Sequence, residues 1–222
     1  IKKLARADVP IVLVDRHIKG LDVPTIQSDN RQGAFDAVEH LVRLGHERIG
    51  IITGIPGIET SDLRFAGYTE ALQQYKIPLR KTFIKEGLFM QDKAMEAAKT
   101  LLKMKRRPTA LFVCNEQMVI GAILAIRELG LKIPEDIALA AFDDTVWGTF
   151  IEPPLTTVRQ PSYTMGMVAF ENLLMEIRGG AQGKRHKETV ILKPELIVRE
   201  SCGAASGEKL PRDSLMPGED NG

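Results

Sequence analysis

The chain has 222 residues, enough to bury one substantial core or two small ones. Its composition is 44% hydrophobic and 27% charged, as in an ordinary globular protein, and its formal net charge of +1 gives no basic surplus for nucleic-acid binding. The sequence has no apolar run of about 18 residues that would predict a membrane span, and the first residues lack the apolar centre of a signal peptide.

Strand and helix patterns alternate from the beginning of the chain, which predicts βαβ units and a mainly parallel sheet. Asp29 is placed to cap the first helix, and Gly45 is placed to end it. In the first half we expect strands at 11–14, 49–53 and 82–85, and helices at 30–44, 61–75 and 92–104.

The second half of the chain continues this alternation and then departs from it. We expect strands at 110–114, 137–142, 156–160, 189–192 and 196–199, and helices at 116–129 and 162–178. The parallel series ends near Phe142, yet an extended segment, a helix and two more strands follow. A two-lobed protein needs such an excursion when its chain passes back across a hinge. From Gly203 onward Gly, Pro, Ser, Asp and Glu dominate, which predicts a disordered tail.

Polar residues stand at the carboxyl ends of three predicted strands, where open parallel sheets bind ligands. These residues are Asp15, Asn115 and Asp143. Arg64 lies in the first turn of a predicted helix and offers a planar fork of donors. From spacing alone the alternatives stay open: the two aspartates could cap the next helices, and Arg64 could be a solvated charge.

Three further side chains complete a candidate pocket for a small polar molecule. Phe89 and Trp147 lie in loops on the same side and could stack against the apolar face of a sugar ring, or could simply cover the core. Gln160 lies on the extended segment that returns toward the first lobe. Periodicity alone therefore supports a doubly wound α/β protein and only suggests a pocket.

Motifs for other chemistry are missing. The loop Gly54–Gly57 is followed by neither a dinucleotide fingerprint nor a Walker lysine, and the sequence has no HExxH, CxxC or GxSxG. His46, near a helix C-terminus, is interpreted as support for the helix dipole or for a last carbonyl. Cys114 lies in an apolar run and is interpreted as a buried thiol. We therefore expect no catalytic residues, no metal and no cofactor.

Five stretches closely resemble signatures of the LacI/GalR family of bacterial transcription regulators. The resemblance covers roughly residues 4–202 and is specific because the motifs occur together in the family's order. The stretches are Asp29-Asn30 with 40–49 (HLVRLGHERI), 64–68 (RFAGY), 108–115 (PTALFVCN), 141–144 (AFDD) with 154–161 (PLTTVRQP), and 196–201 (LIVRES). Two mild departures are Glu116, where the family usually has Asp, and Ala141, where it often has Gly.

The resemblance implies a periplasmic-binding-protein-like I fold: α/β, with two Rossmann-like lobes of parallel sheet flanked by helices and joined by a three-crossing hinge. It implies an incomplete N-terminal lobe from 1–28 and 161–187, a C-terminal lobe from 29–160 and 188–202, and a tail at 203–222. Family members contact effector at positions that match Asp15, Thr60, Arg64, Phe89, Asn115, Asp143 and Gln160. Trp147 is added on the position of its loop.

The implied function is that of a cytoplasmic, non-enzymatic core that senses an effector such as a sugar and modulates operator binding. Operator DNA would be bound through a headpiece outside this chain, and the chain is expected to be part of a longer protein. A homodimer is expected, with the helix 116–129 serving both the core and the interface. The alternative is a periplasmic sugar-binding protein of a transport system, and an α/β enzyme is a third, less favoured option.

Overall fold

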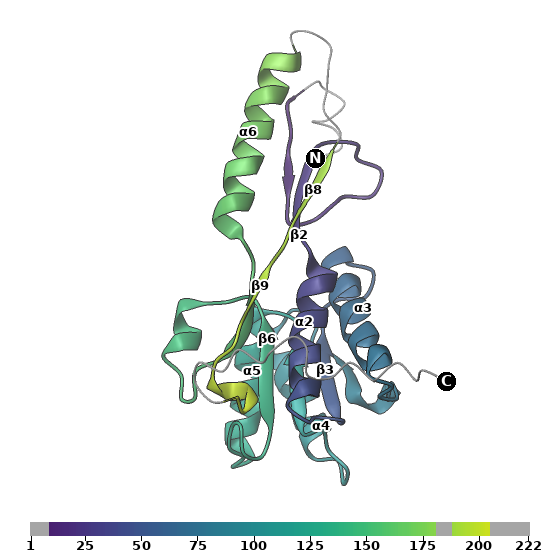
Figure 1. The fold of residues 1–222 in the computed structure, drawn as a ribbon, viewed down its shortest axis with the longest axis vertical. Helices are drawn as coiled ribbons and strands as arrows, with labels where there is room; N and C mark the ends of the chain where they lie inside the picture. The colour runs from purple at the N-terminus through teal and green to yellow at the C-terminus, as the bar shows by residue number, and fades with distance from the viewer. Residues whose placement is uncertain (1–8, 181–187, 205–222) are drawn as a thin grey trace, which may run out of the picture.

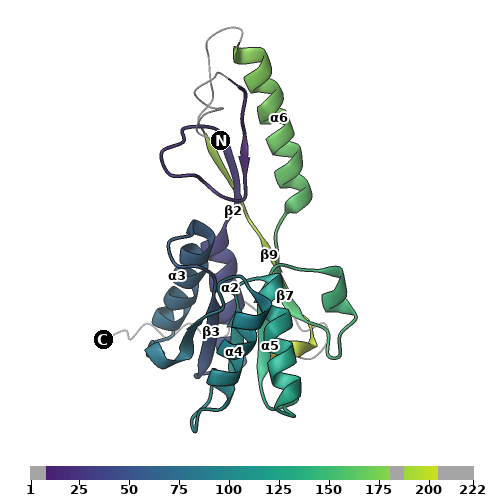
Figure 2. The same ribbon diagram turned by 180° about the vertical axis from the view of Figure 1, so that it is seen from behind.

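The computed structural model describes residues 9–180 and 188–204, which form a small and a larger domain (Figures 1 and 2). The small domain has a parallel sheet in the order β1-β2-β8, and helix α6 packs beside β1 and β2. Its elements are β1 (Leu13–Val14), β2 (Thr25–Ser28), α6 (Ser162–Gly180) and β8 (Thr189–Leu192).

The larger domain is built on a six-stranded sheet in the order β4-β3-β5-β6-β7-β9. All neighbours are parallel except β9, which runs antiparallel to β7. Its strands are β3 (Ile49–Thr53), β4 (Ile84–Glu86), β5 (Ala110–Val113), β6 (Ala138–Phe142), β7 (Thr156–Arg159) and β9 (Glu195–Ile197). Its helices are α2 (Asn30–Arg43), α3 (Glu59–Gln74), α4 (Gln91–Leu102) and α5 (Glu116–Glu128), with short 3-10 helices η1 (Lys81–Phe83), η2 (Val146–Thr149) and η3 (Glu200–Cys202).

The core of the larger domain lies on both sides of this sheet. Every residue of β3, β5 and β6 is buried, as expected for a parallel sheet covered on two faces. Helices α2 and α3 cover one face, and α4 and α5 cover the other (Figures 1 and 2). The predicted doubly wound α/β arrangement is confirmed for this domain.

Each helix pair approaches closely at one glycine. A Cβ on Gly67 of α3 would overlap the carbonyl oxygen of Arg31 in α2, and a Cβ on Gly121 of α5 would overlap the carbonyl oxygen of Gln91 in α4. Both contacts are with backbone, so a larger residue cannot be accommodated by a side-chain rotation. On both faces of the sheet, a glycine thus allows the two covering helices to pack closely against each other.

The predicted ends of α2 are confirmed. The Asp29 carboxylate accepts a hydrogen bond from the backbone N–H of Gln32 at 2.9 Å, which satisfies one of the free donors of the first turn. At the other end Gly45 has φ +91°, a conformation that glycine adopts without a steric penalty.

Three connections join the two domains: β2 to α2, β7 to α6, and β8 to β9. Figure 1 shows β8 and β9 following one another through the narrow waist between the domains. The carboxyl ends of β3, β5 and β6 lie at this waist, because β7 runs parallel to them and leads directly into the second connection. The expected two-lobed architecture with three crossings is confirmed.

Several predicted boundaries were wrong. Residues 25–28 were not predicted as a strand but form β2, since each is buried between β1 and β8. The segment 188–192 was assigned to the C-terminal lobe, but β8 pairs with β2 in the small sheet. The predicted strands at 11–14, 82–85 and 196–199 are 13–14, 84–86 and 195–197.

The predicted tail begins too early. Gly203 ends η3 with φ +86°, and Ala204 is 6% exposed and packs in the core of the larger domain. The rest of the predicted tail, 205–222, lies outside the described residues, as do 1–8 and 181–187 of the predicted N-terminal lobe.

The small domain presents apolar side chains to solvent along α6. Tyr163, Phe170 and Ile177 are 83%, 59% and 54% exposed and recur at helical spacing. Among the described strands, β1 pairs with β2 alone. The described residues of the small domain therefore leave part of its apolar surface uncovered. No helix of the described residues is long and apolar enough to cross a membrane.

Candidate functional site

A buried arginine and a carboxylate meet at the carboxyl edge of the larger sheet. Arg64 Nη1 lies 3.7 Å from Asp143 Oδ2, and the Arg64 side chain is 5% exposed while that of Asp143 is 25% exposed. Asp143 directly follows β6 and has φ +77°, so the chain turns sharply there. Among the described helices, the Asp143 carboxylate caps none; its partners are Gln160 and Arg64.

Arg64 is fixed in place by the elements around it. Its Nε donates to Asn30 Oδ1 at 2.8 Å, and its Nη1 donates to the carbonyl oxygen of Cys114 at the end of β5. The guanidinium carbon lies 3.7 Å from the centroid of the Phe142 ring, a cation–π geometry. Arg64 is therefore a preorganised group at the strand tips, and the alternative of a solvated charge is wrong.

Gln160 connects this cluster to the hinge. Its Nε2 donates to Asp143 Oδ1 at 2.6 Å, so the amide holds the carboxylate oxygen that does not face Arg64. Gln160 follows β7 directly and stands at the start of the connection to α6. A group that displaced this hydrogen bond would act on a residue of the hinge itself.

The small domain brings a second acidic residue toward the same cluster. Asp15 follows β1 and has φ +73°. Burial raises the pKa of Asp15, the cations of Arg64 and Arg16 lower it, and the carboxylate of Asp143 raises it further. Two residues after Asp15, the backbone N–H of His17 donates to Glu59 Oε2 of α3, so this segment of the small domain faces the larger domain.

Two polar contacts already bridge the junction. Gln27 of β2 donates its Nε2 to Glu59 Oε2 of α3 at 2.8 Å, and the backbone N–H of His17 donates to the same oxygen at 3.1 Å. Sequence reasoning missed Gln27 and Glu59, and it also missed Asn30 as the partner of Arg64. Asn30 could have been identified from the sequence, because it belongs to the Asp29-Asn30 motif. Nothing in the local sequence distinguishes Gln27 or Glu59.

Comparison with known proteins places this geometry in a family. The model of the periplasmic binding protein-like domain matches residues 38–202. The chain belongs to the periplasmic binding protein-like family. Among solved structures, a LacI-family regulatory protein from Chloroflexus aggregans has 32% identity and a TM-score of 0.81 over 90% of this chain and 71% of that chain. The resemblance to LacI/GalR regulators is confirmed.

Curated relatives of this periplasmic binding protein-like chain are repressors. The transcriptional repressor PurR of Haemophilus influenzae is 34% identical over 87% of this chain, and CytR of Escherichia coli is 35% identical over 88%. The chain spans about half the length of these relatives, 57% and 56% respectively. A structure of the transcriptional regulator CelR in complex with cellobiose has 30% identity and a TM-score of 0.81, covering 89% of this chain and 60% of that chain.

Three more of the predicted ligand contacts of this periplasmic binding protein-like domain are engaged in, or buried by, its own structure. Asn115 caps α5 by accepting from the Met118 N–H at 2.9 Å, so the capping role considered for the aspartates belongs here. Trp147 Nε1 donates to Glu116 Oε1 at 2.9 Å. Glu116, which stands where the family usually has Asp, thus has a hydrogen-bond partner in Trp147. Thr60 is 4% exposed in the first turn of α3.

Phe89 lies where the sequence placed it, in the loop after β4, but it also packs inward. It has φ +59°, and a Cβ on Gly54 would overlap the Phe89 ring. Phe89 therefore packs over the end of β3 and partly covers the core, which was the alternative to a ligand contact. Its ring is available to a ligand only on the side that faces away from Gly54.

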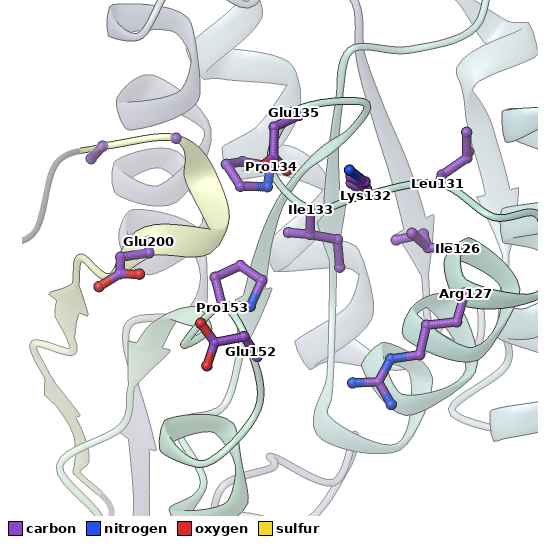
Figure 3. A pocket seen from close by; sticks show the side chains of 12 residues that line it. Ile126, Arg127, Leu131, Lys132, Ile133, Pro134, Glu135, Glu152, Pro153 and Glu200 are labelled. Atoms are coloured by element: carbon purple, nitrogen blue, oxygen red, sulfur yellow. The ribbon is translucent and has the colours of Figure 1, made fainter.

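A cavity of 790 Å³ lies elsewhere in this family domain, at the end of the sheet remote from the hinge (Figure 3). Its lining comes from the end of α5, the loops before β6 and β7 and the segment around η3, and includes Ile133, Pro134, Glu152, Pro153 and Glu200. None of the predicted ligand contacts lines it. Within the described ranges, no three His, Cys, Asp or Glu side chains are arranged to hold a metal ion.

Proposed function

We propose that this chain is the effector-sensing core of a DNA-binding transcriptional regulator. The observation that carries the proposal is the contact of Arg64, Asp143 and Gln160 at the strand tips, opposite Asp15 of the small domain. The effector is a small polar molecule bound between the domains, and a sugar fits best, because paired hydroxyls match a carboxylate beside a guanidinium. The similarity to a regulator solved with cellobiose supports this choice.

In this proposal Asp143 accepts hydrogen bonds from adjacent hydroxyls, while Arg64 donates to ring or hydroxyl oxygens. Asn115, Thr60 and Gln160 add polar contacts, and Phe89 and Trp147 cover apolar faces of the ligand. No bond of the ligand is broken, so the chain acts as a binding protein and not as an enzyme. As a regulator of operator DNA it acts in the cytoplasm.

The effector changes DNA binding through the hinge. It stabilises one arrangement of the two domains only to the extent that it binds that arrangement more tightly than the other. A difference of about 1–3 kcal/mol would change operator affinity roughly 5- to 150-fold. Gln160 is placed to sense the ligand, because it contacts Asp143 and starts the second connection. The DNA-reading headpiece lies outside this chain.

Titration calorimetry with a panel of sugars, cellobiose included, and of purines tests the proposal. Asp143→Asn keeps the shape of the side chain but removes its charge, and we expect it to weaken binding of the active ligand at least tenfold. Asp92→Asn, an exposed carboxylate in the first turn of α4, is the matched control and should bind as the parent does. Equal binding by both variants would refute the site.

We also propose that the regulator is a homodimer. The prediction that α5 serves the core holds, since Met118, Val119 and Ile126 are buried. The exposed apolar residues near its start are in and after η2, where Val146 is 78% and Phe150 81% exposed. Phe150→Glu should convert the dimer to a monomer in light scattering. A parent protein that is monomeric at high concentration would contradict this proposal.

A further inference from the structure

A second concave site, rich in positive charge, lies at the opposite end of the larger domain from the hinge. It is a cavity of 550 Å³ formed by the loop before β3, the segment after α3 and the loop before β5. Its lining residues are Glu47, Arg48, Tyr75, Lys76, Ile77, Pro78, Arg80, Lys105, Arg106 and Arg107.

Six of these ten residues are cationic and one is acidic, in a chain whose formal net charge is only +1. Arg48 and Arg107 are partly engaged: Arg48 Nε donates to the carbonyl oxygen of Arg107 at 3.1 Å, and Arg107 Nη2 lies 3.6 Å from Asp136 Oδ1. Lys76, Lys105 and Arg106 are exposed and form no ion pair with any residue that the structure describes.

Arg80 is likewise exposed and without an ion pair in the described ranges, although its guanidinium lies 5.6 Å from the centroid of the Phe83 ring. Like charges held close together repel, and this repulsion opposes folding. A bound anion with several charges would offset the repulsion of all these cations at once. The arrangement thus favours a polyanion over a ligand with a single charge.

Apart from Glu47, the rest of the cavity lining is formed by Tyr75, Ile77 and Pro78. Ile77 and Pro78 lie beside Tyr75, whose hydroxyl donates to Glu39 Oε1 at 2.9 Å and accepts from Arg43 Nε at 3.1 Å. These two hydrogen bonds hold the Tyr75 ring, which is half-buried, in one orientation. A planar base could stack on such a ring at little entropic cost.

We propose that this basic cavity binds a nucleoside di- or triphosphate. The phosphates contact Lys76, Arg80, Lys105 and Arg106, and the base lies against Tyr75, Ile77 and Pro78. The volume is in the range of small-molecule pockets, and a concave site encloses a small molecule better than the convex backbone of a DNA duplex. The site is separate from the Arg64–Asp143 cluster, because it lies at the amino ends of β3 and β5 whereas the cluster lies at strand carboxyl ends.

Calorimetry on the full chain at fixed ionic strength tests this inference with four probes: ATP, inorganic tripolyphosphate, adenosine and a short DNA duplex. We expect saturable binding of ATP, at least fivefold weaker binding of tripolyphosphate and no measurable binding of adenosine. No saturable ATP binding, or tighter binding of the duplex than of ATP, would overturn the proposal. Equal affinity for ATP and tripolyphosphate would overturn the nucleoside part of it.

The double variant Lys76→Gln/Arg80→Gln should lower ATP affinity at least tenfold. The matched control Lys19→Gln/Arg178→Gln also removes one lysine and one arginine from the exposed surface, both in the small domain, and should change affinity less than twofold. Without ATP the pocket variant should melt at or above the parent temperature, since a repulsion is removed. If both variants lose ATP binding equally, the binding is nonspecific and the site is refuted.

Discussion

Arg199 donates two hydrogen bonds to the Asp144 carboxylate: Nη1 to Oδ1 at 2.8 Å and Nη2 to Oδ2 at 3.3 Å. Arg159, the last residue of β7, donates its Nε to Oδ2 of the same carboxylate at 2.9 Å and also lies 3.9 Å from Glu195 at the start of β9. Asp144 thereby connects two of the three crossings at their base in the larger domain. Its neighbour Asp143 faces Arg64 instead, so the two adjacent aspartates have separate partners.

Asp144→Asn should lower the free energy of unfolding by about 1–3 kcal/mol, because Arg199 and Arg159 lose a charged acceptor at a partly buried position. Burial would raise the pKa of Asp144, but hydrogen bonds from Arg199, Thr157 and Arg159 lower it from 3.8 to about 2. The folded-state pKa is depressed, so this stabilisation is complete above the unfolded value and is lost as pH falls from about 3.8 to about 2. Urea unfolding of parent and variant across this range should converge at the acid end.

Gly67→Ala and Gly121→Ala should each destabilise the protein by about 1–3 kcal/mol or more, because the added methyl group meets backbone of the neighbouring helix. Gly166→Ala on α6 is the matched control. Nothing lies within 4 Å of its added Cβ, so the helix propensity of alanine should stabilise by about 0.5–1 kcal/mol. Chemical denaturation of the three variants measures the change in the free energy of unfolding, which should be a loss for the first two and a gain for the control. An equal loss in all three variants would contradict the packing argument.

Gly54→Ala should displace the Phe89 ring and lower ligand affinity through that displacement. The double variant Gly54→Ala/Phe89→Ala removes the overlap. Its loss in free energy of unfolding should therefore be smaller than the sum of the losses in the two single variants. A coupling of about 0.5–3 kcal/mol in this cycle is expected for residues in direct contact. Additive single effects would show that the ring does not respond to residue 54.

Two histidines should make the protein less stable in mild acid. Burial lowers the pKa of His40 from 6.5, and the cations of Arg43 and His46 lower it further; burial also lowers the pKa of His46, opposed by a hydrogen bond to the backbone of Cys202. Their folded-state pKa values are depressed, so stability is full above pH 6.5 and falls as the pH drops below it. Each histidine adds up to about 1.4 kcal/mol per pH unit to this slope.

Unfolding measured at pH 7 and 5.5 checks this expectation, with the variant His40→Gln/His46→Gln as comparison. The loss on acidification should be smaller in the variant than in the parent. His46 bonds a last carbonyl of α2, as expected, but through its backbone: its N–H donates to the carbonyl oxygen of Leu41 at 3.2 Å, whereas the side-chain Nδ1 lies 3.0 Å from Thr109 Oγ1. An identical acid loss in both proteins would assign the effect to carboxylates.

The sequence by itself determined the elements of the larger domain. Ile49–Thr53, Ala110–Val113 and Ala138–Phe142 are continuous apolar runs, and Asp29 and Gly45 carry the chemistry of helix ends. These signals act within a few residues, so they are legible without knowledge of the fold. The position of Arg64 and Asp143 at an edge of the domain followed from the same reasoning, with the family motifs indicating that they matter.

Only the tertiary structure decided which residues meet. Nothing near Thr25–Ser28 marks it as a central strand, because its burial depends on β8, more than 160 residues later. The pairing of Arg64 with Asn30, of Asp144 with Arg199, and of Gln27 with Glu59 likewise joins distant segments. The six cations of the basic cavity come from three loops that the sheet gathers at one end. Such contacts are set by packing of the whole chain, whereas periodicity and caps report only local conformation.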